Sequence, residues 1–78
     1  MDRSSTYRLN VIIKTSQGPW LQTLFPDATL LTHSATEVEI AHQLEDMAAV
    51  YGFLLRIRDA GLCVQSIHVN ALDDVINS

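Results

Sequence analysis

The segment from Asp46 to Gly61 limits what this chain can fold into more than any other part of the sequence. Its apolar residues recur at three- and four-residue spacing, which is typical of an α-helix with one buried side. The stripe consists of Met47, Val50, Leu54 and Ile57, widened by Phe53 and Ala60. Asp46 suits the N-cap of this helix, and Gly61 suits the left-handed residue that follows its last turn. The rest of the chain has to supply a layer against which this single long helix packs.

Four other segments have the two-residue period of β-strands and supply that layer. Tyr7 to Lys14 alternates apolar and polar residues, with β-branched side chains among them. Ala28 to Ser34 and Glu37 to His42 predict two strands joined by a tight turn. Leu62 to Asn70 predicts the last strand. A short helix over Trp20 to Phe25 is expected to lie over the edge of the core.

The facing of the hairpin side chains follows from the pairing of its strands. If Ser34 pairs with Glu37, then Leu31 and His33 lie on the same face as Val38. Leu30 and the neighbouring polar side chains then take the other face. This pattern predicts an antiparallel sheet that is covered on one side.

The last strand poses a conflict between its two apolar pairs. Leu62 and Val64 share one face under strict alternation, whereas Ile67 and Val69 share the other. A strand that is buried on one side accommodates both pairs only with a bulge near Ser66, or with a second covered face. Both solutions remain open at this point.

Together these segments predict a small α+β fold in the order strand, short helix, strand, strand, helix, strand. One main helix packs on one face of a four-stranded antiparallel or mixed sheet, and the last strand runs parallel to the third through a right-handed crossover. We expect a disordered N-terminus over residues 1–6, a single domain over residues 7–70 and a flexible tail over residues 71–78.

The second half of the chain resembles a family of small uncharacterised bacterial proteins. The family's helix has the form Asp-x-Ala-Ala-Leu-x-Gly-x-Leu, followed by Arg-Ile-Arg-Asp-x-Gly-Leu and an apolar strand. The matching residues here are Asp46, Ala48, Ala49, Val50, Gly52, Leu54, Arg56 to Asp59, Gly61, Leu62, Val64, Ser66 and Ile67. With the opening strand the resemblance covers roughly Tyr7 to Val69, and it departs at Leu55 and Gln65. The resemblance implies this architecture and no particular activity.

Charge and cysteine content exclude several classes of protein. The net charge is −4, and the five cations are scattered, which argues against binding to nucleic acid. Cys63 is the only cysteine, so we expect it to be a small packed residue and expect no disulfide and no zinc cluster. The N-terminal residues lack the apolar core of a signal peptide, and no apolar run is long enough to span a membrane. A cytoplasmic protein without a cofactor is expected.

Candidate catalytic and metal-binding residues are few. His33 and His42 are expected on one face of the hairpin, too far apart along it to share a metal ion. Ser66 and His68 share a face of the last strand, but neighbours along a strand rarely align for catalysis. Arg56 lies one helical turn before Asp59, which suits a solvated ion pair better than an anion site. The sequence therefore predicts a protein that is not an enzyme.

The outer face of the long helix carries Ala48, Tyr51, Gly52 and Leu55, where a surface helix normally carries charge. Gly52 lowers helix stability by about 1 kcal/mol relative to alanine. One explanation is an interface, because Ala48 and Gly52 let another backbone approach closely. The other is that the segment around Trp20 covers Gly52 within the monomer.

These features favour a homo-oligomerising interaction module, a dimer, which associates through this helix face or through an unpaired strand edge and presents a surface to a protein partner. Charged residues make up only 18% of the chain, against about 25% in an average domain. A small-ligand sensor is the alternative, because Gly52 to Val69 resembles the second half of regulatory amino-acid-binding domains. Those domains need a second helix of similar length, and the segment around Trp20 is too short for one.

Overall fold

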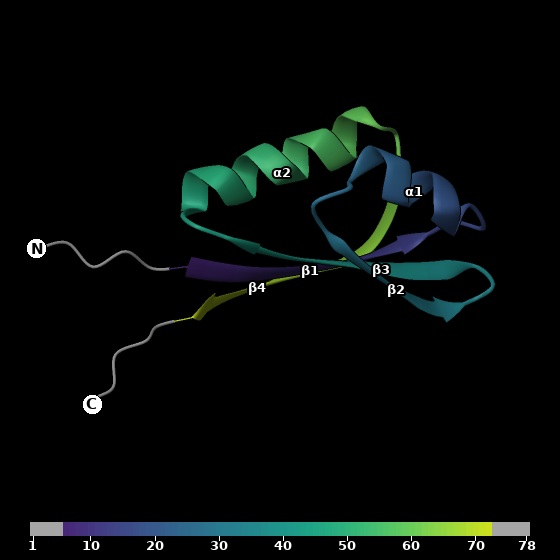
Figure 1. Ribbon diagram of the computed structural model, residues 1–78, viewed down its shortest axis with the longest axis horizontal. Helices are drawn as coiled ribbons and strands as arrows, with labels where there is room; N and C mark the ends of the chain where they lie inside the picture. Colours follow the sequence, from purple (N-terminus) through teal and green to yellow (C-terminus); the bar gives the residue numbers. More distant parts are fainter. Residues whose placement is uncertain (1–5, 73–78) are drawn as a thin grey trace, which may run out of the picture.

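The computed structural model describes residues 6–72, which form four strands and two helices (Figure 1). The elements in chain order are β1 (Thr6–Lys14), α1 (Gly18–Leu24), β2 (Thr29–Ser34), β3 (Glu37–Leu44), α2 (Met47–Asp59) and β4 (Cys63–Leu72). This order and the α+β class are those that the sequence predicts. Thr6, Ala71 and Leu72, which the sequence analysis placed in the termini, belong to strands. The rest of both predicted terminal segments lies outside the described residues.

The four strands form one sheet in the order β2-β3-β1-β4, and every neighbouring pair is antiparallel. The sheet is therefore antiparallel throughout and not mixed. β4 does run in the same direction as β3, as expected, but β1 lies between them. Both helices lie on one side of the sheet, and the other side is open (Figure 1).

A bulge in β4 resolves the conflict between its apolar pairs. Ile12 pairs with Ser66, and Ile13 pairs with Val64, so Gln65 is an extra residue in β4. The extra residue reverses the alternation and brings Val64 to the same side as Ile67 and Val69. Of the two solutions that the sequence left open, the bulge is the one that the structure adopts.

The hairpin of β2 and β3 also contains a bulge, and here the expected facing is wrong. Ser34 pairs with Glu37 as predicted, but Thr32 pairs with Val38, so His33 is the extra residue. A one-residue shift moves every following side chain to the opposite face. Leu31 and His33 consequently lie on the open side of the sheet, and Leu30 packs against the core on the helix side.

The two ends of α2 have the caps expected from the sequence. The Asp46 carboxylate accepts a hydrogen bond from the Ala49 backbone N–H at 2.8 Å, which satisfies one of the free amides of the first turn. Gly61 has a φ of +72°, a left-handed conformation that residues with a Cβ rarely adopt. Between these caps the helix is continuous, so its buried stripe presents one face to the sheet.

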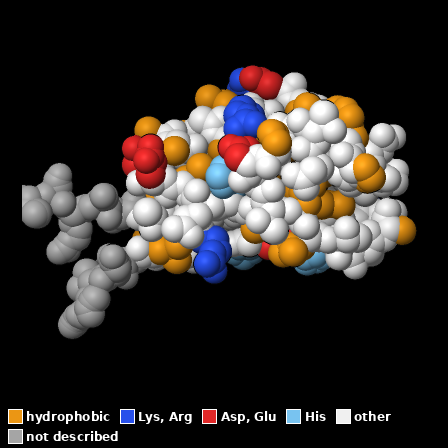
Figure 2. All heavy atoms as spheres, viewed as in Figure 1, with side chains coloured by type: hydrophobic (Ala, Val, Ile, Leu, Met, Phe, Trp, Pro, Cys, Tyr) orange, Lys and Arg blue, Asp and Glu red, His pale blue; other side chains and the backbone are white. Residues whose placement is uncertain are grey.

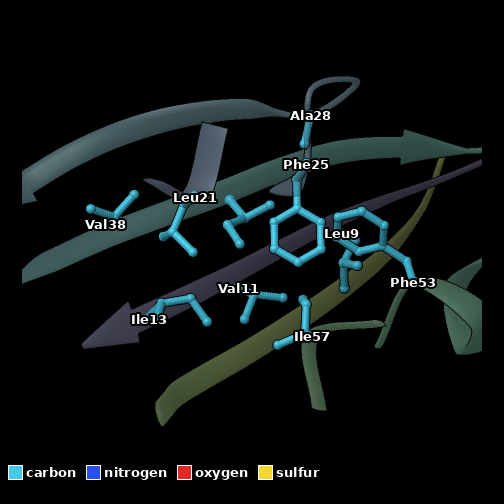
Figure 3. Close-up of a cluster of buried hydrophobic side chains, with 10 residues drawn as sticks. Leu9, Val11, Ile13, Leu21, Phe25, Ala28, Val38, Phe53 and Ile57 are labelled. Carbon is cyan, nitrogen blue, oxygen red and sulfur yellow. The ribbon is translucent and has the colours of Figure 1, made fainter. Parts of the chain in front are cut away.

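The core lies between the helices and the three strands β1, β2 and β3. Leu9, Val11 and Ile13 follow one another along β1 and are fully buried (Figure 3). They pack beneath a layer of buried side chains from both helices and the α1–β2 connection, namely Leu21, Phe25, Val50, Phe53 and Ile57. Leu54 is only partly buried and Met47 is exposed, so the buried stripe of α2 is narrower than predicted.

The short helix α1 is present, but it buries other residues than expected. Pro19 lies in its first turn, where the missing N–H has no helical partner in any case. Leu21 is fully buried and Phe25 nearly so, whereas the Trp20 side chain is 46% exposed. Leu21 of α1 and Phe25, the residue that follows the helix, therefore pack into the core, and Trp20 stays at the surface.

Candidate interaction surface

One flank of α2 is joined to α1 through Arg56. The Arg56 guanidinium donates a hydrogen bond to the Leu24 carbonyl oxygen at 3.2 Å. It also lies 5.1 Å from the ring centroid of Phe25 and 5.2 Å from that of Phe53, within the range of cation–π interactions. The predicted pairing with Asp59 is wrong, because Arg58 contacts Asp59 instead. Arg56 thus connects the two helices through this hydrogen bond and its contacts with the two aromatic rings.

The outer face of α2, turned away from the buried Val50, Phe53 and Ile57, carries the four residues predicted for an interface. Tyr51 and Leu55, two of the four residues predicted for an interface, are 62% and 50% exposed. Ala48 and Gly52, the other two, are also exposed. A Cβ at Gly52 would have no neighbouring atom within 4 Å, so α1 does not cover this glycine.

Strand β4 adds exposed apolar side chains that the sequence analysis did not assign to a surface. Val64, Ile67 and Val69 pair with buried residues of β1 and therefore point toward the helix layer. Each nevertheless keeps more than a third of its surface exposed, because α2 approaches β1 and β3 more closely than β4. We call these three side chains the β4-side apolar surface.

The outer edge of β4 is long and uncharged. The strand has ten residues, and none of them is Asp, Glu, Lys, Arg or Pro. Within residues 6–72, no strand pairs with this edge. Proteins usually protect such edges with charges, prolines or short strands, because the free N–H and C=O groups otherwise pair with another chain. Figure 2 shows charged side chains as a few separate groups on the face in view, most of which is apolar or uncharged.

The open side of the sheet carries a hydrogen-bonded row centred on Glu39. His33 Nε2 lies 2.7 Å from Glu39 Oε1, and Asn10 Nδ2 donates to Glu39 Oε2 at 2.6 Å. The hydrogen bond from His33, followed by that from Asn10, lowers the pKa of the Glu39 carboxyl below its ordinary value. The row connects β2, β3 and β1, and it holds Glu39 in its ionised form.

A shallow hollow of about 370 Å³ lies beside this row. It exists because Ala41 is a small residue between longer neighbours on the adjoining strands. Its lining residues are Arg8, Asn10, Thr29, Leu31, Ala41, His42 and Gln43. Arg8 supplies the positive charge of the hollow, and the other side chains supply neutral polar groups and one apolar wall.

The histidines do not form a metal site. His33 is on the open side of the sheet, whereas His42 packs edge-on against Phe53, with ring centroids 4.9 Å apart, so the expectation that they share a face is wrong. His42 Nε2 also lies 3.4 Å from a carboxylate oxygen of Asp27. In the part of the chain that the structure describes, no three His, Cys, Asp or Glu side chains are grouped closely enough to hold a metal ion.

The remaining candidates are surface residues. Ser66 and His68 pair with Ile12 and Asn10 and share the open side of the sheet, as expected from their spacing. Cys63 is exposed, so the prediction of a packed cysteine is wrong. It lies at the start of β4 and pairs with Lys14 on β1.

Neither helix within residues 6–72 has the length and apolar character needed to cross a membrane. No curated protein and no solved structure matches this chain. The model of one protein family, described as Domain of unknown function (DUF8691), matches residues 8–68 and so covers β2, the whole of α2 and the first six of the ten residues of β4. The chain therefore belongs to this family of small domains of unknown function.

Proposed function

We propose that this protein is a non-enzymatic, cytoplasmic module that forms a homodimer and presents a surface to a protein partner. The β4-side apolar surface carries this proposal. Its three side chains, Val64, Ile67 and Val69, are each more than a third exposed on one strand, and exposed apolar patches often mark interaction sites. Because only 18% of the residues are charged, few charged side chains are available to keep a monomer with such a patch soluble.

The polar groups support binding better than catalysis. Glu39, on the open side of the sheet, has a lowered pKa, and both its oxygens already accept hydrogen bonds. A general base for reactions near neutral pH needs the opposite, a raised pKa and a free oxygen. The exposed thiol of Cys63 supports a reducing compartment, and the net charge of −4 argues against nucleic acid as the partner.

Light scattering on the purified chain tests the proposal. We expect a mass of twice 8.7 kDa at micromolar concentration, and a monomer of 8.7 kDa throughout would overturn the proposal. Val69→Glu places a charge in the β4-side apolar surface and should dissociate the dimer while the monomer stays folded, because Val69 is 38% exposed. Trp20→Glu is the matched control, because Trp20 is 46% exposed but lies on α1, away from this surface. It should leave the dimer intact.

A small-ligand sensor is the second candidate, and the hollow on the open side of the sheet favours it. Arg8 would attract an anionic group such as a carboxylate, next to the polar side chains of Thr29 and Gln43. Helix α1 has seven residues and α2 has thirteen, so the second long helix of amino-acid-binding regulatory domains has no counterpart among the described elements. Thermal unfolding with a panel of amino acids and nucleotides tests this function, and stabilisation by any one of them would favour it.

A further inference from the structure

We propose that two copies associate by antiparallel pairing of their β4 strands, so that the dimer has one continuous eight-stranded sheet. This inference rests on the proposed function and specifies how the two copies meet. After the bulge at Gln65, β4 runs from Ser66 to Leu72 without a further register shift. Its outer edge therefore offers a regular row of N–H and C=O groups to a second strand.

A second copy of β4 complements this edge on both faces. A two-fold axis perpendicular to the sheet keeps the helix side of one copy next to the helix side of the other. With the two-fold axis at His68, Ile67 of each copy meets Val69 of the other copy, and such cross-strand aliphatic pairs stabilise a sheet. On the open side, His68 then meets His68 and Ser66 meets Asn70, and no Asp, Glu, Lys or Arg of either strand faces another.

The apolar side chains of β4 complete the contact on the helix side of the paired strands. Both copies carry their helices on the same side of the joined sheet, so the side chains of Val64, Ile67 and Val69 lie between the two helix layers. A second copy of β4 covers these exposed side chains and pairs with the free main chain of the strand together.

Backbone amide exchange, measured residue by residue by NMR on the intact chain, tests the pairing. In an antiparallel edge, alternate N–H groups point outward. We expect every second amide between Ser66 and Leu72 to exchange at least about tenfold more slowly in concentrated than in dilute protein, because mass action favours the dimer. A dimer in which these amides exchange equally fast at both concentrations overturns the strand pairing but not the proposed function. A chain that stays monomeric overturns both.

A pair of lysine variants locates the contact. Ile67 on β4 and Leu31 on β2 are 47% and 46% exposed, and each lies on an edge strand. Ile67→Lys puts a charge into the paired edge and should raise the dimer dissociation constant at least about tenfold, because each lysine would replace an aliphatic contact with Val69 of the other copy by a charge on an apolar side chain. Leu31→Lys should leave that constant within about twofold. The reverse result, with dissociation by Leu31→Lys alone, assigns the contact to β2 and overturns the inference.

Discussion

The two edges of the sheet are similar in sequence but lie in different surroundings. Neither β2 nor β4 contains Asp, Glu, Lys, Arg or Pro. On β2, Leu30 packs against the core, helix α1 lies close by, and His33 is hydrogen-bonded to Glu39 on the next strand. On β4, three apolar side chains point toward the helix layer and remain exposed. β2 therefore has one apolar side chain packed against the core although its other residues are exposed, and composition alone does not reveal this difference between the two edges.

The difference arises from the way in which the two helices share the sheet. Arg56 joins α2 to α1, and α2 comes closest to β1 and β3. The four strands span about 14 Å at a spacing of about 4.8 Å, which is wider than one helix with its side chains, about 10–12 Å. A single long helix that is drawn toward α1 therefore leaves the strand on the far side of β1 without cover.

The largest expected effect comes from comparing two isoleucines, one in the core and one on the exposed strand β4. Ile57 on α2 is 1% exposed and belongs to the core, whereas Ile67 on β4 is about half exposed. Ile57→Ala should lower the free energy of unfolding by about 2–5 kcal/mol, because it leaves a cavity in a packed core. Ile67→Ala should lower it by less than about 1 kcal/mol in the monomer.

Urea unfolding at a concentration where the chain is monomeric measures both changes. A loss at Ile67 as large as that at Ile57 would mean that β4 is covered in the monomer. The comparison between the two edges would then fail.

A smaller effect on stability is expected at Glu39, because its hydrogen bond with His33 links β2 to β3. Glu39→Gln keeps the shape of the side chain but removes the charge that strengthens the hydrogen bonds from His33 and Asn10. It should lower the free energy of unfolding by about 1 kcal/mol near neutral pH. Glu37→Gln is the control, because Glu37 accepts one exposed hydrogen bond, from Gln65, and its loss should be smaller.

The pH dependence of the Glu39 effect has a definite sign. The folded-state pKa of Glu39 lies below its ordinary value, chiefly because of the His33 hydrogen bond. Its contribution to stability is fully present above the ordinary carboxyl pKa of about 4.3 and is lost as the pH falls through the lowered value. The stability difference between wild type and Glu39→Gln should therefore narrow on acidification below about pH 4. A stability difference that grows below about pH 4 would contradict the lowered pKa of Glu39.

The sequence predicted the elements, their order and both caps of α2, because these depend on local patterns around residues such as Asp46 and Gly61. It also predicted that Tyr51 and Leu55 lie outside the buried stripe. It did not predict the exposure of Ile67, because alternation shows which face a side chain takes but not whether another element covers that face. It misplaced His33, because a bulge next to a turn depends on pairing with β3 and has no local signal here.

The smallest expected effect concerns Gly52, on the helix face that the sequence predicts for an interface. Gly52 is exposed in the middle of α2, and a Cβ there meets nothing. Gly52→Ala should therefore raise the free energy of unfolding of the monomer by about 0.5–1 kcal/mol through helix propensity alone. Gly61→Ala is the control with the opposite sign, because its φ of +72° is unfavourable for alanine.

The same variant separates the β4-side apolar surface from the outermost face of α2. If the dimer is held by β4, Gly52→Ala should leave its dissociation constant unchanged. If Gly52 and Ala48 instead allow two helices to approach closely, the added methyl group should weaken the dimer even as the monomer becomes more stable. Measuring unfolding and dissociation on one variant thus decides whether the outer face of α2 contacts the second copy.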